Sequence, residues 1–192
     1  MDPTERRELI LTAASRAFAS RPYEEVSLAA IADEAHASEA LVHKYFVSKA
    51  GIYAQVLQRA TDELAERTRQ TDDALPPDSS ARDRVRASIL TYLDFIAERS
   101  PGWMAYQILA GHEPGEAAQV RQAAREAAVA ALSDVVGGGR GHRDDFAFWG
   151  YLGFLDDACL RWVHAGCPDE QRHSLVDAAL GCLEGALGDW RK

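Results

Sequence analysis

Residues 10–57 read ILTAASRAFASRPYEEVSLAAIADEAHASEALVHKYFVSKAGIYAQVL, and this stretch decides the fold of the 192-residue chain. Apolar residues recur in it three and four positions apart, which is the spacing of one buried face of an α-helix. Pro22 ends the first helical segment, and a serine stands directly before each of the next three: Ser27, Ser38 and Ser48. A supporting helix followed by two short helices and a tight turn is the pattern of a helix-turn-helix, whose second helix enters the major groove of DNA.

The tight turn, residues 34–38, reads EAHAS and contains no glycine. One residue of such a turn normally adopts a left-handed conformation, for which glycine is the usual choice. His36 stands in that place, and histidine is among the non-glycine residues enriched at positive φ. We therefore expect His36 to have a positive φ and to carry some backbone strain.

The second short helix is expected to present one face to base edges and the other to the domain core. Its apolar residues should mostly face the core: Leu41, Val42, Tyr45 and Phe46. The remaining positions form the exposed set, to which the hydroxyl of Tyr45 can be added: Glu39, Ala40, His43 and Lys44. Lys44 can donate to guanine or to phosphate. Glu39 can accept from cytosine N4, or act only as a favourable charge at the helix N-terminus.

A phosphate-binding group is predicted where the fourth helical segment begins. Lys49 is unfavourable at the first position of a helix, because the positive end of the helix dipole repels it, and an anionic partner reverses that sign. The alternative is that Lys49 is a solvated surface residue. Ser27 offers similar N–H and hydroxyl groups. The predicted DNA-binding set is Ser27, Ser38, Glu39, Ala40, His43, Lys44, Tyr45 and Lys49.

The net charge is −9, from 21 Lys and Arg residues against 30 Asp and Glu residues. Residues 1–48 contain 5 basic and 8 acidic residues, a difference of −3. This balance excludes a protein that grips nucleic acid or an anionic membrane through overall positive charge. We expect few phosphate contacts, a modest dependence of DNA affinity on salt, and a large contribution from base contacts.

Helical periodicity continues beyond this stretch, without the alternation that is typical of strands. We expect an all-α fold of about nine helices, with a DNA-binding domain over residues 1–48 and a helical ligand-binding and dimerisation domain over residues 49–192. Residues 71–80 are expected to form a loop, and residues 137–141 a flexible break. A fifth helix is expected to carry an apolar stripe over residues 85–96 and to stop near Pro101, and residues 103–110 form a short apolar run. The later helices are expected at about 116–136, 144–165 and 169–190.

Small residues gather on the last two helical segments, in a set that we expect at a helix–helix interface: Gly150, Gly153, Ala178, Gly181, Cys182 and Gly185. Glycine inside a helix costs about 1 kcal/mol relative to alanine, and close packing against another helix would account for that cost. The packing is either within the chain or across a homodimer.

Large aromatic and amphipathic residues are frequent between residues 92 and 162, which suits either a mostly apolar ligand pocket or a well-filled core. The candidate ligand-binding residues are Tyr92, Trp103, Met104, Tyr106, Gln107, Trp149 and Phe154. Asp156 and Asp157 interrupt the apolar run FLDDACLRW, residues 154–162. A buried carboxylate needs a partner, so one of the two faces a cationic ligand, or they pair with Arg161 or are exposed.

The sequence carries few signals of other chemistry. Its three cysteines form no C-x-x-C pair and fit a reducing cytosol, and no nucleophile constellation or phosphate-binding glycine loop occurs. The longest stretch without Asp, Glu, Lys or Arg, residues 100–112, is shorter than the roughly 20 apolar residues of a membrane helix. We expect a cytoplasmic protein that is not an enzyme and has no cofactor, no metal and no membrane partner.

Residues 6–57 resemble the DNA-binding domain of a known family, the TetR/AcrR-type (tetracycline-repressor-like) transcriptional regulators. Ala14 and Phe18 match core positions of the first helix of its DNA-binding domain. SLAAIADEA matches the second helix, SEALVHKYF the recognition helix, and the following SK the opening of the fourth helix. The resemblance covers about a quarter of the chain, because the family's ligand-binding domains diverge widely.

Four residues depart from the family pattern. His36-Ala37 replaces the usual Gly-Val of the turn, and Ala40 stands where glycine is common. His43 occupies a place that is usually tyrosine and that often touches phosphate. These departures leave the fold expectation intact but put the contacts of His36 and His43 in question.

The resemblance implies a homodimer that binds double-stranded operator DNA and acts as a ligand-responsive regulator, expected to be a repressor. In the implied mechanism, a small-molecule effector moves the fourth helix, changes the separation of the two recognition helices and lowers operator affinity. Such an effector must bind the two states with different affinity. The alternatives are a helical partner-binding protein with little or no DNA binding and a helical enzyme.

Overall fold

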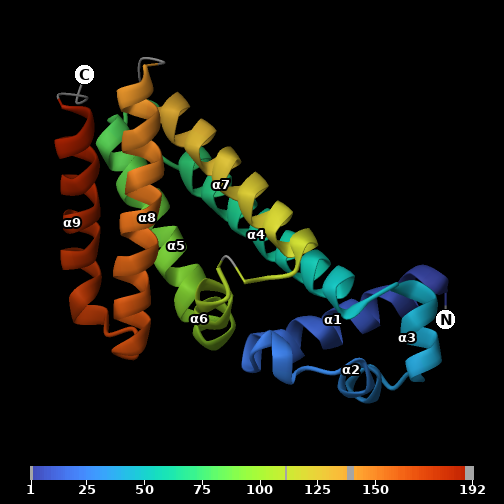
Figure 1. The fold of residues 1–192 in the computed structure, drawn as a ribbon. Helices are drawn as coiled ribbons and strands as arrows, with labels where there is room; N and C mark the ends of the chain where they lie inside the picture. Colours follow the sequence, from blue (N-terminus) through green and yellow to red (C-terminus); the bar gives the residue numbers. More distant parts are fainter. Residues whose placement is uncertain (1, 111, 138–140, 189–192) are drawn as a thin grey trace. The chain divides into compact units, whose positions relative to one another are not determined.

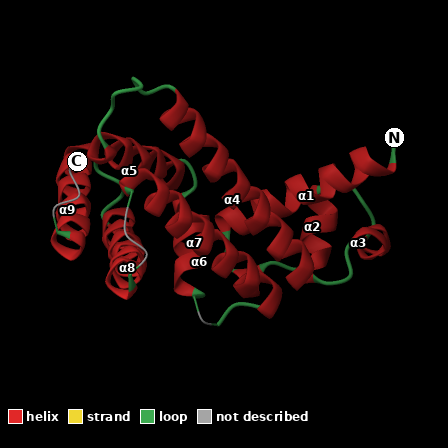
Figure 2. Cartoon of the chain, turned by 90° about the horizontal axis from the view of Figure 1, so that it is seen from above, coloured by secondary structure: helices red, strands yellow, loops and turns green. Residues whose placement is uncertain are grey.

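The structure, a computed structural model, describes residues 2–110, 112–137 and 141–188, apart from the side chain of Ser100. All regular elements within these residues are helical, as Figures 1 and 2 show, which confirms the predicted all-α class. No helix among them is long and apolar enough to span a membrane. The elements are α1 (Pro3–Ser20), the short 3₁₀ helix η1 (Tyr23–Glu25), α2 (Leu28–Glu34), α3 (Glu39–Tyr45), α4 (Lys49–Asp73), α5 (Ala81–Ala97), α6 (Ser100–Ile108), α7 (Gly115–Val136), α8 (His142–His164) and α9 (Asp169–Leu187).

The three serines identified in the sequence cap the helices that follow them. Ser27 Oγ accepts the Ala30 N–H at 3.0 Å at the start of α2, and Ser38 Oγ accepts the Leu41 N–H at 3.2 Å at the start of α3. Ser48 Oγ accepts the Gly51 N–H at 3.0 Å at the start of α4. Each bond satisfies a donor that the first turn of a helix leaves free, so the starts of α2, α3 and α4 are fixed by local sequence.

Two predicted boundaries are wrong. Residues 71–73, expected in a loop, are the last residues of α4, where Arg69 bonds Glu66 and Asp73 of the same helix and supports its final turns. The last helix, expected to reach Trp190, ends at Leu187, because Gly188 has a φ of +83°. Trp190 lies outside the described residues, as do residues 138–140 of the predicted break.

The chain forms two compact units. Unit 1 comprises the chain up to Asp62 together with Arg99–Gln122, and unit 2 comprises Glu63–Glu98 together with the chain from Ala123 onward. Helices α4 and α7 each contribute residues to both units. The sequence predicts a functional division at residue 48, with DNA binding before it and ligand binding and dimerisation after it. This functional division stays a prediction.

Unit 1 is built on the core of the predicted helix-turn-helix. The predicted inner face of α1 is buried throughout, at Ile10, Ala13, Ala14, Ala17 and Phe18. From the other elements the core takes Val26, Ile31, Ala32, Val42, Phe46, Ile52 and Tyr53. Burial of this continuous apolar cluster holds α2 and α3 against α1 and the start of α4.

Unit 2 is a helical bundle in which α8 and α9 lie side by side and α5 packs against both (Figure 1). The stripe predicted for α5 supplies Val85, Ile89, Leu93 and Ile96 to its core. Helix α8 adds Tyr151, Leu155, Cys159 and Trp162, and α9 adds Val176, Ala179, Leu180 and Leu183.

Candidate DNA interface

The turn between α2 and α3 has the backbone conformation expected from the sequence. His36 has a φ of +48°, and its side chain is exposed. The His36 N–H donates to the Asp33 carbonyl at 3.1 Å, and the Ala37 N–H donates to the Ala32 carbonyl at 2.9 Å. The left-handed residue therefore lets the turn close on the end of α2 and sets the direction in which α3 leaves.

Helix α3 presents the expected residues to solvent. Val42 and Phe46 are buried, and Leu41 and Tyr45 are half-buried. The exposed side chains of the helix are those of the predicted set: Glu39, Ala40, His43 and Lys44. This orientation suits base reading, whereas DNA contact by these residues stays a prediction.

Two of the exposed polar side chains lie near other side chains of α3. His43 Nε2 lies 4.0 Å from Glu39 Oε1, one helical turn away. Lys44 Nζ lies 6.0 Å from the centre of the Tyr45 ring. Glu39 also lies in the first turn of α3, where a carboxylate interacts favourably with the helix dipole, so both readings of Glu39 remain open.

Lys49 is not simply solvated, contrary to one of the two alternatives considered for it. Its ammonium donates to the Tyr23 carbonyl at 2.9 Å and lies 4.1 Å above the centre of the Tyr23 ring. The contact ties the first residue of α4 to η1, which is separated from Ser27, the cap of α2, by Val26 alone. A phosphate at this position would therefore meet an ammonium that is already held in place.

Arg7 is a connecting residue that the sequence did not reveal. Its guanidinium donates to Gln55 Oε1 of α4 and lies 5.1 Å from the centre of the Phe46 ring at the end of α3. Nearby, Arg59 of α4 pairs with Glu8 of α1 at 3.1 Å. The periodicity of α1 shows only that Arg7 lies near the surface, since its partner in α4 is 48 residues away.

The predicted ligand-binding residues are divided between the two units. Trp103, Met104, Tyr106 and Gln107 belong to α6 in unit 1, whereas Tyr92, Trp149 and Phe154 belong to unit 2. Trp103 is buried, and Phe154 is partly exposed on α8. Ligand binding by this set stays a prediction.

In unit 2, Asp156 has different partners from the one considered in the sequence. Tyr92 Oη donates to Asp156 Oδ1 at 3.0 Å, and Arg125 of α7 pairs with Asp156 Oδ2. For Asp156 the pairing with Arg161 is therefore wrong, whereas Asp157 is exposed, which was one of the outcomes expected for these two carboxylates. The Arg125 guanidinium lies 5.7 Å from the centre of the Trp149 ring, so two of the predicted ligand-binding residues flank this half-buried ion pair.

A second ion pair, missed in the sequence, is buried in unit 1. Arg121 Nε donates to Glu113 Oε1 at 2.6 Å, and Arg121 Nη2 donates to the Tyr106 carbonyl at 2.6 Å. The guanidinium also lies 3.5 Å from the centre of the Tyr106 ring. Only 12% of the Arg121 side chain and 3% of the Glu113 side chain are exposed. Burial raises the pKa of the nearby Tyr53 hydroxyl well above its usual range, so that group stays neutral.

The predicted interface residues of α8 and α9 have open space beside them within the chain. A Cβ atom added at Gly150, Gly153, Gly181 or Gly185 would meet no other atom within 4 Å. Phe146 of α8 is 75% exposed, and Ala178 of α9 is also exposed. Among the described residues, no atom lies close enough to a Cβ at these four positions to require a glycine there. Packing within the chain and pairing with a second copy both stay predictions.

The chain is similar in sequence to known bacterial regulators. Residues 10–56 match the family model described as bacterial regulatory proteins, tetR family. The HTH-type transcriptional activator FasR of Mycolicibacterium smegmatis is 33% identical to this chain over 187 residues, which make up 95% of this chain and 83% of FasR.

Two solved structures extend the comparison to the fold. A tetR-family transcriptional regulator from Streptomyces coelicolor superposes with a TM-score of 0.77 at 24% identity, over 97% of this chain and 80% of the other. The fatty acid degradation regulator FadR from Bacillus halodurans superposes with a TM-score of 0.70 at 15% identity, over 100% of this chain and 98% of the other. At these identities the two structures show a shared fold alone.

Proposed function

Because the chain belongs to the tetR family of bacterial regulatory proteins, and is a transcriptional regulator rather than an enzyme, we propose that it binds operator DNA through α3. The observation that carries this proposal is the exposed face of α3, where Glu39, Ala40, His43 and Lys44 stand on a helix whose start is capped by Ser38. A short, rigidly placed helix with an exposed polar face is what major-groove reading requires. Lys49 and Ser27 are the proposed phosphate contacts on either side.

The regulator is proposed to act as a homodimer. One helix-turn-helix covers few base pairs, and a dimer reads two half-sites about 34–36 Å apart or a multiple of that distance. The open glycine positions of α8 and α9, together with exposed Phe146, supply an apolar surface that a second copy can cover.

The body of the protein is proposed to bind a small-molecule effector. Tyr92 and Trp149 lie at the Arg125–Asp156 pair in unit 2, where aromatic surface and directional polar groups are combined as in ligand sites. The effector is proposed to shift α4 and lower operator affinity, with a coupling of about 1–3 kcal/mol. The regulator is further proposed to reside in the cytoplasm and to repress transcription. The relative FasR is a transcriptional activator, so a reporter assay must decide between repression and activation for this chain.

A gel-shift titration with DNA from upstream of the protein's own gene, alongside a random duplex, tests DNA binding. We expect the upstream DNA to bind more tightly, and its affinity to fall by less than about 100-fold between about 50 and about 200 mM salt. Combined Lys44→Ala and Lys49→Ala should weaken binding and flatten the salt dependence. Arg69→Ala, outside the predicted set, is the matched control.

Equal binding of both duplexes, or unchanged affinity in the double lysine variant, would overturn the proposed interface. Absence of DNA binding together with capture of a protein partner would favour the partner-binding alternative, which the acidic balance of residues 1–48 supports. A thermal-shift screen of small molecules, followed by gel shift with each molecule that binds, tests the effector. A molecule that stabilises the protein without changing operator affinity would contradict the coupling.

A further inference from the structure

The two halves of α4 are held in different ways. The buried side chains of this helix are Ile52, Tyr53, Ala54 and Leu57, all within its first nine residues. The residues from Gln58 to Asp73 are half-buried or exposed. Apolar burial therefore anchors the start of α4 in unit 1, and its second half, which belongs to unit 2, has much less of it.

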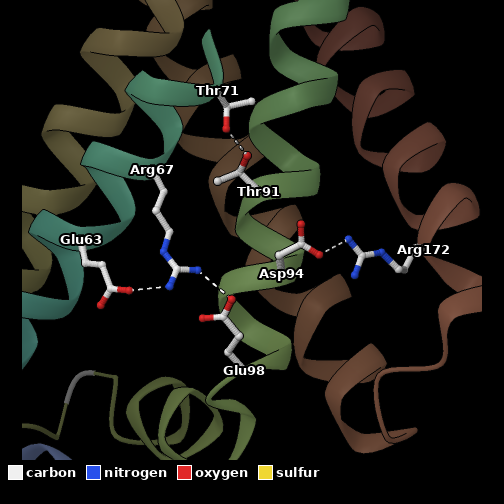
Figure 3. A network of polar contacts seen from close by, with 7 residues as sticks. All are labelled: Glu63, Arg67, Thr71, Thr91, Asp94, Glu98 and Arg172. Carbon is white, nitrogen blue, oxygen red and sulfur yellow. Dashed lines mark hydrogen bonds and ion pairs between the residues drawn. The ribbon is translucent and has the colours of Figure 1, made fainter. Parts of the chain in front are cut away.

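Polar side chains tie this second half to α5 (Figure 3). Arg67 Nη1 donates to Glu98 Oε1 of α5 at 2.8 Å, and Arg67 Nη2 pairs with Glu63 Oε1 of its own helix at 2.7 Å. The hydroxyls of Thr71 and Thr91 lie 2.9 Å apart. Arg84 of α5 also pairs with Asp72 Oδ1 of α4 at 2.7 Å. We call these three links between the helices, Arg67–Glu98, Thr71–Thr91 and Arg84–Asp72, the α4–α5 clasp. An open groove of about 800 Å³ runs beside it, lined by residues of both helices.

Helix α5, in contrast, is fixed to α9 by both apolar and polar contacts. Ile89, Leu93 and Ile96 are buried on its inner face. Arg86 pairs with Asp177 of α9 at 2.9 Å, and Asp94 pairs with Arg172 of α9, as Figure 3 shows. The clasp thus joins a weakly packed helix to a firmly packed one.

The strength of the clasp depends on ionic conditions. The Arg67 side chain is 34% exposed and that of Glu98 48% exposed, so solvent and salt reach the pair. An exposed ion pair of this kind changes an opening equilibrium by about 1.5- to 5-fold, and about 1 M salt screens charges beyond about 3 Å. A small shift of this size suits an element that must change position in response to a ligand.

We propose that the α4–α5 clasp holds the second half of α4 in one of the two positions available to the regulator, so that opening the clasp changes operator affinity. The proposal rests on the proposed function, because it assigns the polar contacts that set the resting position of α4. The competing explanation is that half-buried apolar residues such as Leu64 hold this half of α4 and that the clasp has no effect on its position.

Hydrogen–deuterium exchange of the full-length protein tests the clasp without DNA or effector. The variant is Arg67→Gln, and Arg69→Gln is the matched control, because the ion pairs that Arg69 forms with described residues, to Glu66 and Asp73, lie within its own helix. We expect Arg67→Gln to speed the exchange of amides 63–73 about two- to fivefold more than Arg69→Gln does, with amides 52–57 unchanged. Raising the salt to about 1 M should speed exchange at 63–73 in the wild type and should speed it less in Arg67→Gln, where the Arg84–Asp72 pair is the part of the clasp that salt can still screen. Equal effects of the two variants would overturn the clasp.

Operator affinity, measured on DNA bound by the wild type, tests the regulatory role. We expect Arg67→Gln to change this affinity by about 1.5- to 5-fold, Arg69→Gln to leave it unchanged, and Arg67→Lys to restore most of it. Altered exchange with unaltered affinity would overturn the regulatory role. A wild type that binds no DNA would instead contradict the proposed function, while the exchange result would still decide whether the clasp exists.

Discussion

At the scale of single residues, the turn of the helix-turn-helix carries a strain that can be measured. His36 has a φ of +48°, a conformation that a non-glycine residue adopts at a cost of about 1 kcal/mol or more. We expect His36→Gly to raise the free energy of unfolding by about 0.5–1 kcal/mol in urea denaturation. Ala37→Gly is the neighbouring control, because Ala37 lacks a positive φ and glycine there only loosens the unfolded chain. Equal shifts in both variants would argue against strain at His36.

A second residue acts through close approach of two helices. A Cβ atom at Gly102 of α6 would lie 2.7 Å from the Cα of Ala19 at the end of α1, where backbone cannot yield. Gly→Ala inside a helix usually raises the free energy of unfolding by about 1 kcal/mol. Gly102→Ala should instead lower it by about 1–3 kcal/mol, because the added methyl group overlaps the backbone of α1. At Gly51 of α4 the nearest atoms would lie 3.4 Å away, and Gly51→Ala should be neutral or stabilising. Thermal unfolding of both variants checks the pair, and a stable Gly102→Ala variant would show that α6 shifts easily on α1.

At the scale of elements, the sequence predicts helices well and their partners poorly. The caps and the apolar spacing depend on residues three or four apart, so the starts of α2 and α3 and the exposed face of α3 follow from local sequence. The contacts of Arg7 and Arg125 join residues 48 and 31 positions apart, and the spacing of either arginine within its own helix does not determine such a partner. The predicted end of α4 is wrong for the opposite reason. The polar composition of residues 71–73 is typical of a loop, but ion pairs within the helix support the last turn of α4.

The pair of Arg121 and Glu113 fixes two elements in unit 1, since Arg121 of α7 also bonds the Tyr106 carbonyl of α6. Removing one partner takes the opposite charge away from a largely buried group, so Glu113→Gln or Arg121→Met should each cost about 3–5 kcal/mol of unfolding free energy. Replacing both, with Glu113→Leu and Arg121→Met, should recover most of that loss. A double-mutant cycle from urea denaturation measures the coupling. Additive losses would show that the two residues act independently.

At the scale of the whole molecule, the proposed regulator requires two copies, and the glycines of α8 and α9 allow this to be tested separately from folding. Gly181→Leu has open space within one chain, so the fold should survive, whereas in a dimer paired through α9 the side chain would enter the interface twice. Overpacking of about 1–3 kcal/mol in each copy corresponds to at least about tenfold weaker dimerisation, which analytical ultracentrifugation detects.

The matched control for this test is Gly115→Leu at the start of α7, where an added Cβ also meets no atom within 4 Å. It should leave the dimer intact. Operator affinity should fall with dimerisation in Gly181→Leu, because each recognition helix would then bind its half-site alone. Unchanged self-association in Gly181→Leu would place the dimer interface elsewhere. The small size of the six predicted interface residues would then need an explanation within α8 and α9 themselves.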